Sequence, residues 1–563
     1  MRKPPSLVYG VDERPPRSVT VLSGFQHAAL ISVNLIYPVI IFRVAGVSPA
    51  SVAALLSIGF LVLGIATFLQ ANSRTGSGYM CPATFTATYL APSILAAKAG
   101  GLPLVLGMTA FAGLVEGLVA PALHRLRAFV PVELSGLVIL LIGFTAGLVA
   151  VRTMLGDMGH PPDADEWLAA CIALAATVLL NIWGRGLARM VCALIGMAVG
   201  YVFAALTGVL TAEDFAAIAG ASWLAFPALH IPSWSFDFGL AAAFAIAALA
   251  AAMKALGTLT VCQRTNDADW VRPDQARNFR GVVADSAGTI LSAGLGGVGI
   301  NTSTPSVGLA SATGVASRTI AYATGAIFLG LALTPKIAAV LAVMPRPVMA
   351  ATLLFSACFI VINGLQVVTS RLLDSRRTLV IGMGLLAGAA VEAVPAIAAG
   401  ATEGTRAVLG SSLVFGTVVA FLLNLAFRLG VRQRVTLAID PAAYDPAQVE
   451  GFLRKQGGMW GARADVVNRA IFGASQLVEA AIEHGQAEGG LELEASFDEF
   501  NLEIRLRYRG AALAFPLARP TIAQIQEDDG ARQLAGFLLR RNADRIRAEQ
   551  NGAQAMVWFH FDH

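Results

Sequence analysis

The chain has 563 residues, of which 56% are hydrophobic and 13% are charged, and its mean hydropathy is +0.67. Soluble globular proteins carry about 25% charged residues, so this composition argues against a soluble enzyme and favours a bundle of membrane-spanning helices. The formal net charge of +4 is too small to indicate a nucleic-acid partner. The five cysteines form no Cys-x-x-Cys pair, which argues against a disulfide framework or a metal site.

The distribution of charge divides the chain into three parts. Residues 1–18 form a polar N-terminal segment, residues 19–430 carry nearly all of the apolar runs, and residues 431–563 have the composition of a soluble domain. A helix needs roughly 20 residues to cross about 30 Å of hydrocarbon, and the middle part therefore divides into fourteen candidate spans. These spans are 19–42, 51–71, 78–98, 103–123, 129–151, 166–184, 188–211, 236–262, 281–299, 302–317, 319–343, 346–366, 378–400 and 407–430.

Arginine and lysine gather in alternate connections between these spans. The connections that contain Arg74, Arg185 and Arg277 would lie on the same side as the N-terminus, and the opposite side holds fewer, such as Arg43 and Arg346. Positive residues concentrate on the cytoplasmic side of membrane proteins. We therefore expect a multi-pass protein of the cytoplasmic (inner) membrane with both termini in the cytoplasm.

Two predicted spans break the helical pattern at corresponding places in the two halves. The third span reads GSGYMCPATFTATYLAPS, with Pro82 and Pro92, and the tenth reads GGVGINTSTPSVGLASATG, with Pro305. Paired interrupted helices are typical of a transporter whose binding site lies between inverted repeats. The alternative is that proline and glycine only kink two packed helices.

The segment PSVGLASATG, from Pro305 to Gly314, resembles the signature of the nucleobase–ascorbate transporters, the xanthine/uracil permeases, with Ser306 where Asn is usual. The segments GFQHAAL, PVELSGLVILLIGF, MPRPVMAATLLF and GTVVAFLLNLAF are similar to other parts of that family, and the resemblance covers about residues 8–430. It implies an α-helical membrane protein whose fourteen transmembrane spans form two inverted seven-helix repeats. A core domain (spans 1–4 and 8–11) would hold the substrate, and a gate domain (spans 5–7 and 12–14) would move against it.

The resemblance implies a secondary transporter, or permease, and not an enzyme. Similar proteins move xanthine, urate or uracil, usually together with a proton and often as homodimers. We therefore expect a symporter of a purine-type nucleobase that lies in the lipid bilayer and has no cofactor. Two alternatives remain: an inorganic or organic anion carrier of the same fold, and a permease-like sensor that signals through the C-terminal domain.

The resemblance places the substrate between the third, eighth and tenth spans. On the third span, Thr84, Phe85 and Ala87 are the candidate contacts, and either Phe85 or Ala87 takes the place where the family often has an aromatic ring that stacks on the base. The alternative for Phe85 is packing in the core or against lipid. On the tenth span, the candidates are main-chain groups of Ser306, Val307 and Gly308, where Gly308 would allow close approach.

The eighth span departs most from the family pattern, which is Glu, two residues, Gly, and then Asp or His. Here Lys254 stands at the position of the Glu, and Thr258 stands at the position of the polar partner. A charged lysine can only donate hydrogen bonds, so we expect an anionic or acceptor-rich substrate, such as urate or xanthine in its anionic form. Alternatively, Lys254 pairs with Asp285 or extends to the cytoplasmic edge.

Several other polar residues lie in apolar spans. Asp285 is the first choice for a proton-linked group or for the counter-ion of Lys254, and a structural hydrogen-bonding role is the alternative. His27 matches a family histidine that shapes the core domain, and Thr313 is the threonine of the signature and is expected to support the pocket. Glu116 is expected to face the interior of the bundle, whereas Glu133 lies near a span end and is expected to be solvated or to cap a helix.

The C-terminal part alternates between helical and strand periodicity. ADVVNRAIFGASQLVEAAIEHG predicts a helix, LELEASF and NLEIRLRYRG predict a hairpin around Asp498 and Glu499, ARQLAGFLLRRNADRI predicts a second helix, and AMVWFHF predicts a closing strand. This order resembles the ATP-binding fold of histidine kinases and anti-sigma factors. Gln476 and Ala480 stand where that fold has Glu and the magnesium-binding Asn, and its glycine box is missing. We therefore expect a non-catalytic α+β domain with a regulatory or dimerising role.

Overall fold

The computed structural model describes most of the chain. The described residues are 2–122, 132–155, 162–228, 232–270, 273–369, 373–394, 396, 409–427, 433–460, 462, 464–483, 488–497, 501–511, 513–516, 518, 520 and 530–562. Contacts between residues divide the chain into two compact units. The first, here called the membrane unit, comprises Met1–Val368 and Met383–Ala420, and the second, the C-terminal unit, comprises Thr369–Gly382 and Phe421–His563. The predicted domain boundary between residues 430 and 431 lies outside the described residues.

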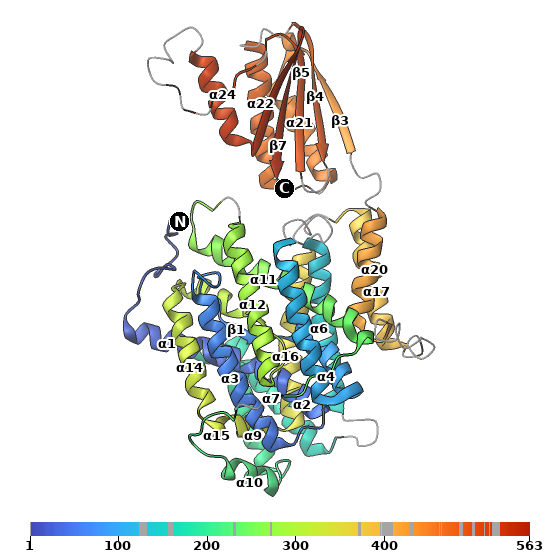
Figure 1. Cartoon of the computed structure of the whole chain (residues 1–563). Coiled ribbons are helices and arrows are strands. Elements are labelled where there is room, and N and C mark those ends of the chain that lie inside the picture. The colour runs from blue at the N-terminus through green and yellow to red at the C-terminus, as the bar shows by residue number, and fades with distance from the viewer. Residues whose placement is uncertain are drawn as a thin grey trace. The chain divides into compact units, whose positions relative to one another are not determined.

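The apolar part of the chain is helical, apart from two short strands (Figure 1). In chain order its elements are α1 (Arg17–Ser32), η1 (Val33–Leu35), α2 (Ile36–Val44), α3 (Pro49–Ala71), β1 (Ala83–Phe85), η2 (Ala87–Tyr89), α4 (Leu90–Val119), η3 (Ala120–Ala122), α6 (Val132–Leu155), α7 (Ala164–Trp183), α8 (Leu187–Met190), α9 (Cys192–Leu206), α10 (Ala212–Gly220), α11 (Phe238–Asn266), α12 (Gln275–Leu295), β2 (Ile300–Thr302), α13 (Thr304–Thr313), α14 (Arg318–Ala332), α15 (Pro335–Ala342), α16 (Arg346–Val368), α17 (Ser375–Ala393) and α20 (Ser412–Phe427).

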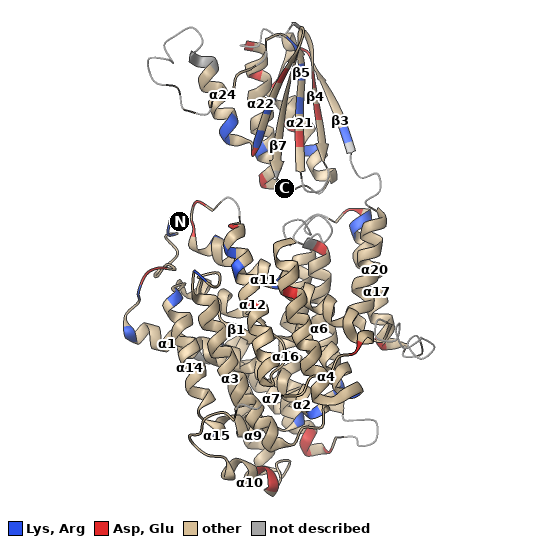
Figure 2. Ribbon diagram, in the orientation of Figure 1, with Lys and Arg blue, Asp and Glu red and all other residues tan. Residues whose placement is uncertain are grey.

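These helices have the length and polarity of a membrane bundle. Within the described residues, seven helices are long and apolar enough to cross a membrane, or up to eight if α14 and α15, which are bent by 83° at their junction, count as one span. Each predicted span overlaps at least one helix, and charged residues lie mainly at helix ends and in connections (Figure 2). The helical membrane fold is therefore confirmed, whereas the count of fourteen crossings stays a prediction.

The helices of the membrane unit pack in two groups. The first group consists of α1, α2, α3, α4, α11, α12 and α14, and the second consists of α6, α7, α9 and α16. In the second group, α6 and α16 approach closely because glycines face the other backbone: a Cβ at Gly136 or Gly143 would lie 2.6 Å from a backbone nitrogen of α16. The first group comes from the predicted core spans and the second from the predicted gate spans 5–7 and 12, and the division into core and gate domains stays a prediction.

The third and tenth predicted spans are not continuous helices. Each contains residues of a short strand that precedes a helix: β1 is followed by η2 and then α4, and β2 is followed by α13. The third and fourth predicted spans are joined in one element, α4, which breaks at Gly100 and at Gly101, where φ is +66°. The alternative in which proline and glycine only kink two helices is therefore wrong.

The N-terminal segment packs across the end of α13. The amide of Val8 donates to the carbonyl of Gly314 at 2.8 Å, and Asp12 forms an ion pair with Arg318. Val11 is buried in the apolar cluster that contains residues of α11, α12 and α13. These contacts fix the end of α13 that points away from the strands.

The C-terminal unit contains one antiparallel sheet with strand order β3-β4-β5-β7-β6. Its elements are β3 (Gln433–Ile439), η4 (Pro441–Ala443), α21 (Pro446–Trp460), α22 (Ala464–Glu483), β4 (Glu488–Phe497), β5 (Asn501–Arg509), α24 (Gly530–Asn542), β6 (Arg545–Asn551) and β7 (Gln554–Asp562). The helix α22 packs against β5 and β7, and alternate residues of β5 are buried beneath it.

The predicted helix, hairpin and closing strand of this unit are confirmed as α22, the pair β4–β5, and β7. Residues 498–500, where the hairpin turn was predicted, lie outside the described residues. The second predicted helix was too long, because α24 ends at Asn542 and the chain enters β6 at Arg545. The elements β3, α21 and β6 were not predicted; the residues of β6 are mostly exposed and polar, so they show no apolar alternation.

The packing of Tyr89 gives a test of the region around β2. The ring of Tyr89 is buried, and a Cβ at Gly299 would lie 2.2 Å from its Cδ2. We expect Gly299→Ala to lower the stability of the purified protein by about 1–3 kcal/mol, because the ring cannot move away inside a packed core. Gly330→Ala in α14 is the matched control, since nothing lies within 4 Å of its Cβ position. Thermal unfolding in detergent measures both variants, and equal transition temperatures would contradict the expectation.

Candidate functional site

The two chain breaks meet as a pair of antiparallel strands. Ala83 lies opposite Thr302, Thr84 opposite Asn301, and Phe85 opposite Ile300. A 3₁₀ turn and then α4 follow β1, and α13 follows β2. Because the strands run in opposite directions, the two helices leave the pair in opposite directions, and both have their N-termini at it.

Three polar side chains of α12 hold the second break. Asp285, Thr289 and Ser292 are spaced by four and three residues, so they form a stripe along one face of the helix. All three bond to the main chain of the extended segment 298–302. The bonds are Thr302 N to Asp285 Oδ2 at 3.1 Å, Thr289 Oγ1 to the Ile300 carbonyl at 3.0 Å, and Ser292 Oγ to the Val298 carbonyl at 2.6 Å. The stripe satisfies backbone groups that lipid could not satisfy.

The first break is held by side chains of two other helical segments. The hydroxyl of Thr67 in α3 accepts from the amide of Ala83 at 3.1 Å, and the side chain of Asn34 in η1 donates to the hydroxyl of Thr84 at 2.7 Å. Both bonds are in the interior, since Ala83 and Thr84 are each 2% exposed. Thr84 therefore serves to fix β1, and its hydroxyl also donates to the next carbonyl of its own strand.

Phe85 lies in the core of the first helix group. Its ring is 1% exposed and approaches α3 so closely that a Cβ at Gly59 would lie 3.0 Å from its Cζ. This packing favours the core alternative for Phe85 over a ring that stacks on a substrate. Ala87 follows in η2 and is 8% exposed.

One face of α11 contacts both breaks. Three positions of this helix, Ala251, Lys254 and Thr258, are spaced by three and four residues and lie on the same face. Each bonds to a different part of the paired breaks. The bonds are Asn301 Nδ2 to the Ala251 carbonyl at 3.0 Å, Lys254 Nζ to Thr86 Oγ1 at 3.3 Å, and Thr258 Oγ1 with Thr304 Oγ1 at 2.8 Å.

Lys254 is half-buried and directed to the start of η2. Among the described residues, no nitrogen–oxygen contact of 4.0 Å or less joins its ammonium group to Asp285, so the two do not form a direct ion pair. The bond to Thr86 uses one of the three ammonium donors. This arrangement differs from the alternative in which Lys254 extends to the edge of the membrane.

Two exposed glycines lie on the helices that contact the breaks, one on α11 and one on α13. Gly257 lies one helical turn beyond Lys254 on α11, and Gly308 lies one turn beyond Thr304 on α13; both are exposed, and nothing lies within 4 Å of either Cβ position. Because Thr304 bonds to Thr258, this face of α13 is turned toward α11. The close approach of a small molecule to Gly308 stays a prediction.

The other predicted residues of α13 have internal partners. The amide of Ser306 donates to the hydroxyl of Ser303 at 3.4 Å, and the amide of Val307 donates to the Ser303 carbonyl at 3.3 Å. The Ser306 side chain is fully buried and bonds to Ser303 as well. Thr313 is exposed at the other end of α13, and its hydroxyl donates to the carbonyl of Leu309. Thr313 is thus not brought together with the residues around Lys254.

His27 and two glutamates complete the set of buried polar side chains that the sequence analysis named. His27 in α1 is 2% exposed, and its Nδ1 has no hydrogen-bond partner among the described residues. Glu116 in α4 is fully buried, as predicted. Of the two alternatives for Glu133, solvation is wrong, because the residue is 2% exposed; its place in the first turn of α6 is consistent with the other alternative, a role at the start of a helix.

Positive charge reaches the strand pair from two helix starts and from one lysine. The N-terminus of a helix carries roughly +0.5 elementary charge, and two helix starts meet at the strand pair. Lys254 places an ammonium group at one of them, the start of η2. The arrangement is suited to a small anion or to a molecule with hydrogen-bond acceptors at its edge.

Three residues of this arrangement were missed by the sequence analysis: Thr86, Asn301 and Thr304. Each is a small polar residue in a run of similar residues, TFTATY or INTST. Their roles depend on α11, whose contacting residues are 46 to 168 positions away in the sequence. Only the polar runs themselves could have indicated them.

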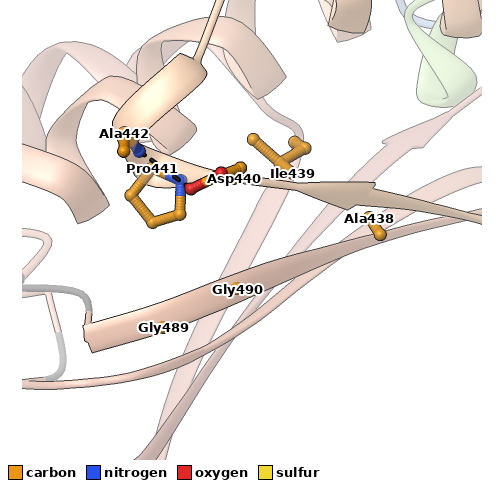
Figure 3. A pocket seen from close by; sticks show the side chains of 7 residues that line it. All are labelled: Ala438, Ile439, Asp440, Pro441, Ala442, Gly489 and Gly490. Carbon is orange, nitrogen blue, oxygen red and sulfur yellow. Dashed lines mark hydrogen bonds between the residues drawn. The ribbon is translucent and has the colours of Figure 1, made fainter.

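The C-terminal unit also has a surface pocket, and few side chains in its lining could bind or react with a ligand (Figure 3). Its lining joins the end of β3 to the start of β4, and its one charged side chain, Asp440, already accepts the amide of Ala442 at 3.0 Å. At the positions that correspond to the ATP-binding fold, Ala480 is buried and Gln476 donates to Glu479 at 2.8 Å.

Comparison with known proteins places the helical part of the chain in one family. The model of the Permease family of xanthine and uracil permeases matches residues 18–397. The chain is similar to the nucleobase transporter PlUacP of Paenibacillus larvae, with 26% identity over 74% of this chain and 96% of that protein. It is also 24% identical to the xanthine permease XanP of Escherichia coli, over 75% of this chain and 94% of that protein, and 24% identical to the uric acid permease PucK of Bacillus subtilis, over 72% and 95%.

The stripe on α12 leads to a prediction about local stability. We expect Thr289→Val to raise the rate of amide hydrogen exchange in residues 298–302 about fivefold, because the loss of one hydrogen bond costs about 1 kcal/mol. Thr313→Val is the matched control, since its hydroxyl bonds only within its own helix. Hydrogen–deuterium exchange with mass spectrometry on the purified protein measures this. Unchanged exchange in Thr289→Val would mean that the stripe does not hold the strand.

Proposed function

This chain belongs to the family of nucleobase–ascorbate transporters, the xanthine/uracil permeases, and we propose that it carries a purine-type nucleobase across the cell membrane as a secondary transporter. The family consists of permeases, which are transporters and not enzymes. Family membership and the apolar helices make the chain a multi-pass protein of the bacterial cell membrane. The observation that supports the proposal most directly is the pair of broken spans, whose helix starts meet Lys254 in the bundle.

We propose that the substrate binds as an anion, such as urate or the anionic form of xanthine. The two helix starts and Lys254 offer donors and positive charge, and the Lys254 ammonium group has two further N–H donors for acceptors on a base. Gly257 and Gly308 leave space for a flat molecule beside them. A neutral base that needs a carboxylate acceptor at position 254 would bind less well.

The residues around this space would have different roles in binding the substrate. Lys254 would bind the negatively charged edge of the base, and Gly308 would allow the base to approach the backbone of α13. Thr258 would keep α13 in place through its bond to Thr304, and Thr84 and Asp285 would keep the two strands in place. Ala87, in η2, would border the base without a stacking ring.

We further propose that transport is coupled to an ion or proton and that the core and gate helix groups move against each other. The distribution of Arg and Lys supports a cytoplasmic location for both termini. A carrier of another organic or inorganic anion is the second candidate, and Lys254 is the observation that favours it. A homodimer is part of the proposal, as in similar proteins.

The C-terminal domain is proposed to be a regulatory or dimerising module. The family match ends at residue 397 and does not include it. Its buried Ala480 leaves no side chain to bind a magnesium ion at the expected position, which supports a role without catalysis.

A charge reversal at Lys254 tests the proposed substrate class. We expect Lys254→Glu and Lys254→Met to weaken urate binding about tenfold to a hundredfold, because a charge-assisted hydrogen bond contributes about 1.5–3 kcal/mol. Lys254→Glu should also raise the relative affinity for uracil. The substrate preference is measured by uptake and binding of radiolabelled urate, xanthine and uracil, and sulfate and bicarbonate are tested as alternative substrates.

The matched control for this test is Lys98→Glu, which reverses the charge of an exposed lysine in α4. It should leave the ligand profile unchanged. An unchanged profile in Lys254→Glu would remove Lys254 from the binding site, and sulfate or bicarbonate uptake without uptake of any base would favour the second candidate.

Truncation tests the role of the C-terminal domain. We expect a chain that ends at residue 430 to keep most of its uptake in membrane vesicles, because the strand pair and all its anchoring helices precede that point. Vesicle uptake should be compared with the full-length protein at equal membrane content. Complete loss of uptake, with the shortened protein folded in the membrane, would show that the domain is required for transport.

A further inference from the structure

Glu116 is a buried carboxyl group that the proposed binding of substrate does not use. It lies in α4, within the span Ala87–Ala122, and is fully inaccessible to solvent. Its Oε2 accepts a long hydrogen bond of 3.4 Å from the hydroxyl of Tyr89, and its Oε1 has no partner among the described residues. A carboxylate in such surroundings is costly, because neither charge nor oxygen is fully compensated.

Glu116 is nevertheless connected to both chain breaks. Tyr89 ends η2, directly after the first break, and its ring lies against Gly299, directly before the second strand. The titratable groups that act on Glu116 are Asp285 from α12, Tyr89 from η2 and Lys254 from α11. Glu116 therefore belongs to one electrostatic cluster with the lysine proposed to bind the substrate.

Asp285 and Glu116 differ in the contacts that a change of protonation would disturb. Asp285 accepts the amide of Thr302 and so holds the second strand in place. Among the described residues, Glu116 binds no backbone group, and a proton on its Oε1 leaves the bond from the Tyr89 hydroxyl to Oε2 intact. Protonation of Asp285 would weaken the bond that holds Thr302, because a neutral carboxyl group is a poorer acceptor than a carboxylate, whereas protonation of Glu116 disturbs no contact of the strand pair.

We propose that Glu116, and not Asp285, carries the proton that accompanies the substrate, an inference that rests on the proposed transport of an anionic base. A proton from the aqueous phase on one side binds to a carboxylate oxygen of Glu116 to give the neutral acid. The same proton leaves to the aqueous phase on the other side after the base has crossed. No other bond is formed or broken.

The charges of the cluster explain why base and proton would travel together. With Lys254 and Asp285 ionised, an ionised Glu116 gives the empty cluster a net charge of about −1. The binding of a monovalent anion alone would make the net charge more negative, about −2, whereas the joint binding of anion and proton leaves the net charge at about −1. In a medium of low dielectric, joint binding avoids the cost of an additional buried charge. Protonation of Glu116 therefore favours binding of the anion.

The test is the pH dependence of urate binding to the purified full-length protein in lipid nanodiscs, over a range in which urate keeps its charge. In the wild type, the affinity should fall by up to about tenfold per pH unit as the pH rises, because one proton is bound with each urate. Glu116→Gln imitates the protonated acid and should bind urate with the same affinity at every pH, close to the wild-type affinity at low pH. Glu116→Asp keeps an ionisable group and should keep a pH dependence.

Glu392→Gln serves as the matched control, because Glu392 forms an ion pair with Arg152 and takes no part in the cluster. Its pH dependence should equal that of the wild type. As a second measurement that needs no variant, addition of urate to weakly buffered wild-type protein should cause uptake of about one proton per bound urate, which alkalinises the solution.

The outcomes separate this inference from the proposed function. If Glu116→Gln binds urate with the wild-type pH dependence, or if the wild type takes up no proton on binding, Glu116 is not the carrier although the protein still binds the base. If Glu116→Gln does not fold, Glu116→Asp decides: a pH dependence that is displaced from that of the wild type supports Glu116 as the carrier, and an identical one excludes it. If the wild type binds none of urate, xanthine and uracil, the proposed function itself fails, and this inference fails with it.

Discussion

The structure depends on a requirement of the membrane interior: backbone groups that are not in a helix must find partners within the protein. The two chain breaks satisfy part of this requirement by pairing with each other as β1 and β2. Polar side chains from α3 and α12 bind further backbone groups of the strands. Each unsatisfied group would cost several kcal/mol in hydrocarbon, so the pair and its anchors form together or not at all.

This pairing also decides where the chemistry of the protein lies. Once the strands are antiparallel, the helices that follow them start at the pair, and their positive ends meet in the bundle. The helix α11 then passes both breaks and joins them through three successive turns of one face. Lys254 is one of these contacts, so the residue proposed to bind the substrate is positioned by the same bonds that hold the fold. The glycines at positions 257 and 308 leave room where other side chains would fill it.

The sequence allowed the membrane fold, the two breaks and the family to be predicted, because each depends on local patterns. Apolar runs set the spans, and proline with glycine marks the places where a helix cannot continue. The partners of individual side chains could not be predicted in this way. Phe85 is an example: the sequence left open whether its ring stacks on a substrate or packs in the core, and its contact with Gly59 of α3 lies outside any local pattern. The bond between Lys254 and Thr86 joins residues 168 positions apart, and no local pattern contains it.

In the C-terminal unit, too, some elements could be predicted from local patterns and others could not. Strict alternation predicted β4, β5 and β7, and apolar residues at helical spacing predicted α22. The strands β3 and β6 lie at the two edges of the sheet, and β6 is mostly exposed and polar. An edge strand is held by one neighbour and needs less buried apolar surface, so its sequence carries a weaker signal.

Lys254, which stands where the family resemblance implies an acidic residue, changes the role of the other charged groups around it. A carboxylate at this position would accept hydrogen bonds from a neutral base, and a second and third carboxylate nearby would repel it. A lysine reverses this relation, because Asp285 and Glu116 become the groups that balance its charge. The lysine can balance one of them fully, and the other then remains as an excess negative charge unless it binds a proton. The backbone amide of Thr302 stabilises charge on Asp285, whereas Glu116 receives only a long bond from a phenol. The excess therefore falls on Glu116, and a protein that accepts an anion beside Lys254 has a physical reason to neutralise this group in the same step.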